Sequence, residues 1–184
     1  MPYLSPSDGG WFVPVSFDVP ESDKNLVESE MHKLLKHLGG DLEIPEINAH
    51  SVVQAEWQGG GPSSEIPGLN SKEPFAQLPN ELKNGPVVLV LHGGGYVTGS
   101  PAMERPATFK LSKMSGARIF SVDYRLAPQS PFPAALIDAV LAYKYLIDPP
   151  AGAHHEAIDP KKLIIAGDSA GVSSFWITTD GRVV

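Results

Sequence analysis

Cysteine is absent from the 184 residues, so the chain has neither a disulfide framework nor a thiol metal site. It also lacks any run of about 18 apolar residues, and we expect no membrane-spanning helix. The 14 Lys and Arg are outnumbered by 21 Asp and Glu, which argues against nucleic acid or an anionic membrane as a partner. The polar residues 1–10 do not resemble a secretory signal, and together with the missing thiols they indicate a cytoplasmic location.

The composition is that of one globular domain, with 42% hydrophobic and 19% charged residues. In the second half, short apolar runs alternate with helical patterns. The runs predict strands over 87–91, 117–122 and 163–166, and the patterns predict helices over 104–115 and 133–147. This alternation indicates βαβ units and an α/β fold with a mostly parallel sheet and flanking helices. We expect Ala107, Leu111 and Met114 to form the buried face of the helix over 104–115.

The first half of the chain is less regular. Apolar residues spaced three and four apart predict a helix over 22–38, which the following pair of glycines ends. Residues 47–57 have the pattern of a strand. Residues 58–86 are rich in Gly, Pro and Ser, which favours a long surface connection.

A serine motif, Gly167-Asp168-Ser169-Ala170-Gly171, directly follows the predicted strand 163–166. Gly-x-Ser-x-Gly after a buried strand is typical of a nucleophile elbow, a tight turn that strains the serine backbone and leaves no room for side chains at the glycines. Serine becomes an effective nucleophile when a general base removes its proton. We therefore interpret Ser169 as a nucleophile and not as a loop serine in a glycine-rich turn.

A glycine motif, His92-Gly93-Gly94-Gly95, closes the predicted strand 87–91. The backbone amides of Gly93, Gly94 and Gly95, with that of Ala170, are candidate oxyanion-hole donors, each worth roughly 3–4 kcal/mol of barrier. A phosphate-binding loop is the alternative, but no Gly-Lys-Ser/Thr ending follows and the dinucleotide spacing is absent. We expect the side chain of His92 to brace this loop and not to act as the base.

Four blocks of the sequence carry a family resemblance: His92–Tyr96 with Gly99, Asp123–Pro128, Pro131–Ala135 with Asp138, and Gly167–Gly171. In this order they resemble the hormone-sensitive-lipase-like branch of the α/β-hydrolase superfamily. The resemblance implies a partial α/β-hydrolase fold over 86–171, a cap-like region with its connection over 1–85, and a divergent tail over 172–184. It further implies hydrolysis of small-molecule carboxylic esters through an acyl-serine, no cofactor or metal, and supporting roles for Asp123, Arg125 and Asp168.

The chain departs from the family after the serine. The family places a catalytic acid and then a catalytic histidine beyond the elbow, whereas all six histidines precede Ser169 and Asp180 is the only acid that follows it. We therefore predict a C-terminally truncated hydrolase that is inactive alone, with the strand 163–166 exposed as a sheet edge. Two alternatives stay open: a non-catalytic remnant that binds a ligand or partner, and an amidase or peptidase. We interpret His154 and His155 as a solvated pair, and the oligomeric state is left open.

Overall fold

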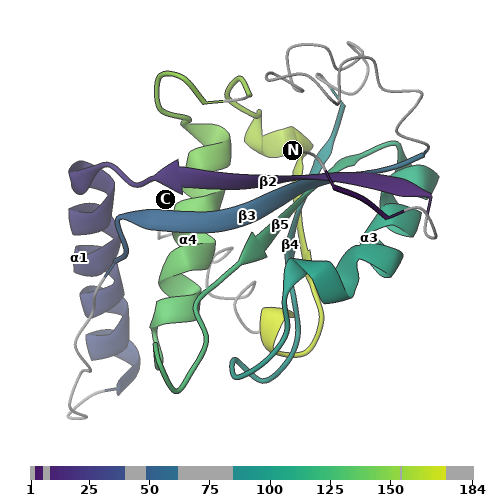
Figure 1. The fold of residues 1–184 in the computed structure, drawn as a ribbon. Coiled ribbons are helices and arrows are strands. Elements are labelled where there is room, and N and C mark those ends of the chain that lie inside the picture. Colours follow the sequence, from purple (N-terminus) through teal and green to yellow (C-terminus); the bar gives the residue numbers. More distant parts are fainter. Residues whose placement is uncertain (1–2, 6–8, 40–48, 62–84, 154, 173–184) are drawn as a thin grey trace.

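The computed structural model describes residues 3–5, 9–39, 49–61, 85–153 and 155–172. Figure 1 shows the elements along the chain. In order they are β1 (Tyr3–Ser5), β2 (Gly10–Asp18), α1 (Glu21–Gly39), β3 (Val52–Gly60), β4 (Val87–Leu91), α3 (Pro101–Ser115), β5 (Arg118–Asp123), α4 (Ala134–Ile147), the short 3-10 helix η3 (Pro160–Lys162) and β6 (Leu163–Gly167).

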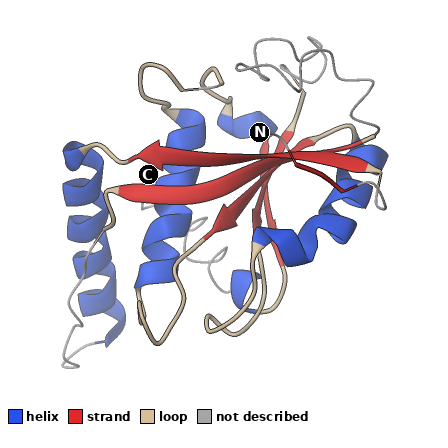
Figure 2. Ribbon diagram, in the orientation of Figure 1, coloured by secondary structure: helices blue, strands red, loops and turns tan. Residues whose placement is uncertain are grey.

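The described strands form one mixed sheet in the order β1-β2-β3-β5-β4-β6, which fans across the centre of Figure 2. β4 lies between β5 and β6 and is parallel to both, as the alternation of strands and helices predicted. The three N-terminal strands pair antiparallel, and β3 is antiparallel to β5. The prediction of a mostly parallel sheet is therefore wrong for the N-terminal half of the chain, where β1, β2 and β3 extend the sheet by antiparallel pairing.

The N-terminal strands also change the interpretation of residues 1–85 as a cap-like region. β2 and β3 are nine residues long and pair along their whole length. Their side chains Val15, Phe17 and Trp57 are buried in the same core as those of β4 and β5. Burial of this apolar surface makes β2 and β3 part of the sheet, whereas residues 62–84 of the proposed connection lie outside the described part of the chain.

Helices cover both faces of the sheet because successive strand residues point to opposite sides. Leu89 and Phe120 share one cluster with the apolar side of α4, and α1 packs against α4 (Figure 1). Val88 and Ile119 form a second cluster, and α3 packs against β3 and β5. The sheet is therefore the middle layer of three, and β4 lies in it between β5 and β6.

Helix α4 is the most buried helix of the described chain. Eleven of its fourteen residues are buried, which agrees with the strong helix predicted over 133–147. The ring of Tyr145 stacks on that of Phe17, with 3.9 Å between the centroids, so the helix is tied to strand β2. The hydrophobic core therefore joins both halves of the chain.

Helix α3 buries a different face from the one that its sequence suggested. Met114 is 77% exposed and Leu111 is 39% exposed, whereas Thr108, Phe109 and Ser112 are buried. The buried hydroxyls are satisfied: Thr108 donates to the side chain of Gln58, and Ser112 donates to the carbonyl of Ala117 at 2.6 Å. A hydrogen-bonded hydroxyl costs little to bury, so hydrophobicity alone could not identify this face.

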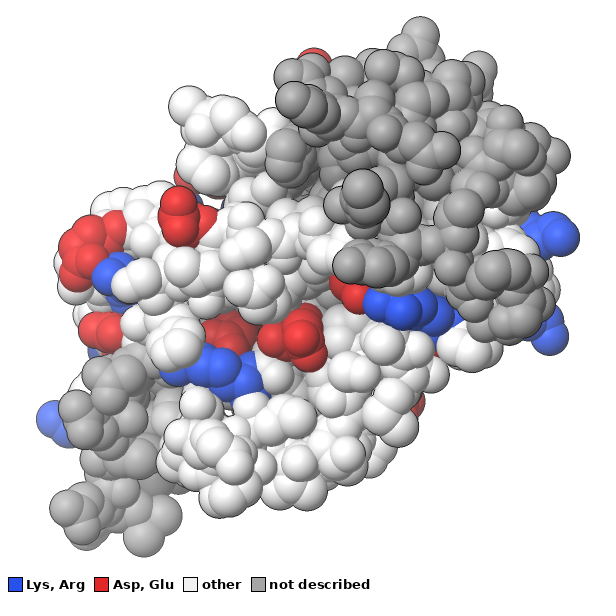
Figure 3. Space-filling model, viewed as in Figure 1, with Lys and Arg blue, Asp and Glu red and all other residues white. Residues whose placement is uncertain are grey.

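Strand β6 lies at the end of the sheet as described, as the sequence predicted. It pairs with β4, and Ile164 on it is 55% exposed. The surface drawn in Figure 3 carries acidic and basic side chains close together, without a broad basic patch in that view. Within the described ranges, no helix combines the length and the apolar character needed to cross a membrane.

A matched pair of substitutions tests this assignment of core and edge. Ile137→Val on α4, where the side chain is 0% exposed, should lower the free energy of unfolding by about 0.5–1.5 kcal/mol. The same change at the exposed Ile164 should cost less than about 0.5 kcal/mol. Urea unfolding measures both, and equal shifts of the midpoint at an unchanged slope would contradict the layer assignment.

Candidate active site

The turn after β6 presents Ser169 at its tip. The serine has a φ of 48°, in the left-handed region where a residue with a side chain is strained. The amide of Gly171 donates to the carbonyl of Asp168 at 2.8 Å, and a helix begins at Ala170. Ser169 is exposed on this turn, so an incoming carbonyl carbon has access to it.

The tightness of the turn depends on its two glycines. A Cβ on Gly167 would lie 2.7 Å from the carbonyl oxygen of Leu91, and one on Gly171 would overlap the same oxygen. The clash that the sequence predicted is therefore present at both positions. It arises because the turn packs directly on the C-terminal end of β4, where the glycine motif begins.

The loop after β4 lies against this turn. A Cβ on Gly93 would overlap Oδ2 of Asp168, so no larger residue fits there without movement. Gly94 has a φ of 116° and Gly95 one of 62°, conformations that glycine adopts readily. The carbonyl of Gly94 accepts the amides of Val97 and Thr98, both at 3.1 Å, which closes the loop. The two predicted motifs are thus neighbours in space.

His92 is built into the interior. Its side chain is 0% exposed, and Nδ1 lies 2.7 Å from the carbonyl oxygen of Gly93. Its ring stacks on Tyr124 at 4.0 Å, and the Tyr124 hydroxyl donates to the carbonyl of His92. Burial raises the pKa of Tyr124, so the hydroxyl keeps its proton and remains a donor. These contacts brace the loop in the way expected of the His92 side chain, and Tyr124, which the sequence placed only inside a motif, is its partner.

Tyr96 links the glycine loop to the serine turn. Its hydroxyl donates to the carbonyl oxygen of Ala170 at 2.7 Å. Ala170 is buried and follows the candidate nucleophile directly. The sequence placed Tyr96 only as the last residue of a motif, because a contact across 74 positions leaves no local pattern.

Arg125 ties the segment after β5 to helix α4. Its guanidinium donates to both oxygens of Asp138, at 2.8–3.0 Å, and its backbone amide donates to Asp138 at 2.9 Å. The Asp138 side chain is 3% exposed. These contacts tie the segment after β5 to α4, and Asp138 is the partner that the sequence did not assign; the supporting role of Arg125 in the site stays a prediction.

Asp123, the second supporting residue, is exposed at the end of β5. Desolvation raises the pKa of its carboxyl above the usual value, an effect that nearby His92 opposes and Glu56 reinforces. His155 is half-buried: its ring lies edge-on to Trp57 and Tyr145 at 5.5 and 4.8 Å. The interpretation of His155 as solvated is thus wrong, and His154 lies outside the described residues.

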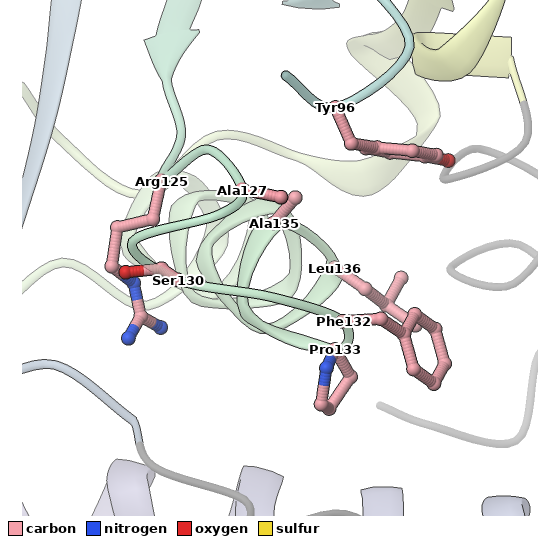
Figure 4. A pocket seen from close by; sticks show the side chains of 8 residues that line it. All are labelled: Tyr96, Arg125, Ala127, Ser130, Phe132, Pro133, Ala135 and Leu136. Carbon is pink, nitrogen blue, oxygen red and sulfur yellow. The ribbon is translucent and has the colours of Figure 1, made fainter.

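An apolar pocket of about 200 Å³ adjoins Tyr96. Figure 4 shows the Tyr96 ring on one side and Leu136 and Phe132 on the other, where the chain enters α4. The pocket is lined by Tyr96, Arg125, Ala127, Ser130, Phe132, Pro133, Ala135 and Leu136. In the described residues, no cluster of three or more His, Cys, Asp and Glu side chains is arranged to hold a metal ion.

Comparison with known proteins agrees with this geometry. Residues 88–173 match a family model described as alpha/beta hydrolase fold. An acetyl-hydrolase of Streptomyces hygroscopicus and an ethyl acetate hydrolase of Pseudomonas putida are each 40% identical over 89 residues, which is 48% of this chain and 27% of each relative. A solved esterase of the bacterial hormone-sensitive lipase family is 26% identical, with a TM-score of 0.51, over 86% of this chain and 50% of that one.

The fold and its two adjoining turns define the chain as an α/β-hydrolase-fold protein. The family model that residues 88–173 match supports this class, and the resemblance to its hormone-sensitive-lipase-like branch is confirmed by the matched esterase. The chain spans about half the length of that esterase.

The ion pair of Arg125 and Asp138 yields a second test. Asp138→Asn removes the buried carboxylate that faces the guanidinium of Arg125, whose side chain is 16% exposed, and should lower the free energy of unfolding by about 3 kcal/mol. Asp148→Asn is the matched control, because Asp148 pairs with Lys144 but its side chain is 75% exposed; it should cost at most about 1 kcal/mol. Chemical unfolding compares the two, and similar losses would show that the Arg125 pair is no more than a surface contact.

Proposed function

We propose that this chain carries the nucleophile and the oxyanion hole of a carboxylic ester hydrolase. Ser169 attacks the ester carbonyl, and the amides of Gly93, Gly94, Gly95 and Ala170 stabilise the negative oxygen of the tetrahedral intermediate. A general base takes the Ser169 proton and passes it to the alcohol, which leaves as its C–O bond breaks and gives an acyl-serine; water then hydrolyses this ester and restores the serine hydroxyl. Asp168, Asp123 and Arg125 support the site without contacting the reacting atoms.

The observation that carries the proposal is the meeting of the two turns at the end of β4. Ser169 has the strained, exposed conformation that an elbow needs, with a φ of 48°. The glycine loop lies against the residue before it, Asp168, and is bonded through Tyr96 to the residue after it, Ala170. Packing against a strained serine is expected of an oxyanion loop beside a nucleophile elbow and is not required of a phosphate-binding loop.

The substrate class is supported by the names of the relatives, an acetyl-hydrolase and an ethyl acetate hydrolase. Small carboxylic esters are therefore the proposed substrates, and neither metal nor cofactor has a part in the proposed steps. The cytoplasmic location stays a prediction.

The described residues do not place a general base beside Ser169. His92 is buried and contacts the backbone of its own loop, and no histidine follows Ser169 in the 184 residues. We propose that residues 1–184 by themselves turn over slowly, because the described residues place no hydrogen-bonded base beside the Ser169 hydroxyl. The same observation favours a second candidate, a hydrolase-derived fragment that binds acyl ligands without catalysis.

An added base distinguishes the slow ester hydrolase from the non-catalytic fragment. Imidazole added to the purified chain should accept the proton of Ser169 and raise p-nitrophenyl acetate hydrolysis above the level measured with Ser169→Ala in the same buffer. Mass spectrometry should then find one acetyl group on Ser169. The control Ser115→Ala, on the exposed end of α3, should behave as the unchanged chain. Identical rates for all three proteins, each shown to be folded, would favour the non-catalytic fragment.

A glycine pair tests the oxyanion loop. Gly95 and Gly116 have nearly the same φ, 62° and 68°, and a Cβ would meet no atom within 4 Å at either. Alanine should therefore cost the same stability at both, about 1 kcal/mol. Alanine keeps the amide of residue 95, but relief of its left-handed strain should turn that amide away and lower the imidazole-supported, serine-dependent rate by up to about 10²-fold, while Gly116→Ala should leave that rate unchanged. Equal rates in the Gly95→Ala and Gly116→Ala variants would contradict the proposal that Gly95 is an oxyanion-hole donor.

A further inference from the structure

Two tyrosines hold the glycine loop, one at each end. At its start, Tyr124 stacks on the His92 ring and donates its hydroxyl to the His92 carbonyl. At its end, Tyr96 donates its hydroxyl to the Ala170 carbonyl at 2.7 Å. Between them lie three glycines, whose backbone has the widest conformational freedom of any residue. The two hydroxyls thus limit where the amides of these glycines can point.

The backbone of Tyr96 is itself strained. Its φ of 63° places a bulky side chain in the left-handed region, which persists only when surrounding contacts fix it. Its carbonyl accepts the amide of Ala127 at 2.8 Å, and its ring lies against Tyr124 with 6.4 Å between centroids. These contacts direct the hydroxyl to Ala170 and hold the ring as one wall of the apolar pocket.

The bond from Tyr96 connects the two separate sources of oxyanion donors. Gly95 is covalently adjacent to Tyr96, and the amide of Ala170 belongs to the residue whose carbonyl Tyr96 holds. An oxyanion hole works only when its donors converge to within about 2.7–3.1 Å of one oxygen. The hydrogen bond from Tyr96 to Ala170 limits how far the glycine amides and the Ala170 amide can separate, and therefore affects whether they converge on one oxygen.

We propose that Tyr96 is a positioning residue, whose hydroxyl sets the distance between the glycine amides and the amide of Ala170. Its effect on catalysis rests on the proposed ester hydrolysis, whereas its effect on the geometry of the amides does not. Tyr96 touches no reacting atom in this arrangement. It acts through the Ala170 carbonyl, while its ring keeps the pocket wall in place.

Tyr96→Phe removes the hydroxyl and keeps the ring. Tyr143→Phe is the matched control, because Tyr143 lies on α4, away from both turns, and is half-buried. In ¹³C,¹⁵N-labelled protein, Tyr96→Phe should shift the carbonyl resonance of Ala170 and the amide resonances of Gly94, Gly95 and Ala170. The control should leave these four signals in place. Unmoved signals in Tyr96→Phe would overturn the positioning role, whatever the activity of the chain.

The kinetic test uses the imidazole-supported hydrolysis of p-nitrophenyl acetate. Loss of one neutral hydrogen bond should lower kcat by about tenfold, with KM changed by less than about twofold, because the ester in its ground state does not contact the hydroxyl. A rise in KM at constant kcat would instead make Tyr96 a substrate contact and overturn the proposal. If the unchanged chain shows no serine-dependent turnover, the proposed function fails, and the resonances of Gly94, Gly95 and Ala170 decide the positioning role alone.

Discussion

The site depends on how closely two backbones approach at the end of strand β4. Leu91 is the last residue of β4, and its carbonyl oxygen lies too close to leave room for a Cβ on Gly167 or Gly171. This contact lets the serine turn rest on the same strand end from which the glycine loop begins. Because β4 is parallel to both β5 and β6, the C-terminal ends of all three strands meet at one edge. A single steric condition therefore determines where the serine turn and the glycine loop meet.

Much of this arrangement could be read from residues 86–171, because there the local patterns and the tertiary structure agree. Each strand that was predicted after residue 86 is present, since a run such as Val87–Leu91 is buried on both faces and must therefore be apolar throughout. The strain at Ser169 was likewise predictable, because the turn chemistry of Gly-x-Ser-x-Gly determines it locally. The assignment of catalytic roles stays a prediction built on that geometry.

Other features depended on contacts that no local pattern records. The buried face of α3 uses Thr108 and Ser112, whose hydroxyls become compatible with the interior only through partners on β3 and after the helix. Strand β2 carries a proline at position 14 and lacks a clear period, and its pairing with β3 spans the whole of α1. Arg125 and Asp138 pair across a turn into α4. In each of these cases the contact joins residues distant in sequence, or it buries a polar side chain where the sequence pattern predicted an apolar one.

The position of β6 in the sheet has a consequence for the motions of the nucleophile. Within the described strands, β6 is hydrogen-bonded to β4 alone, and the chain passes from it directly into the turn of Ser169. Strands bonded on one side open locally at lower free energy than central ones, and their amides exchange with solvent sooner. The serine turn thus follows a strand that is bonded on one side, whereas the glycine loop continues from β4, which is bonded on both sides. Fluctuations that separate the two turns will therefore originate on the serine side.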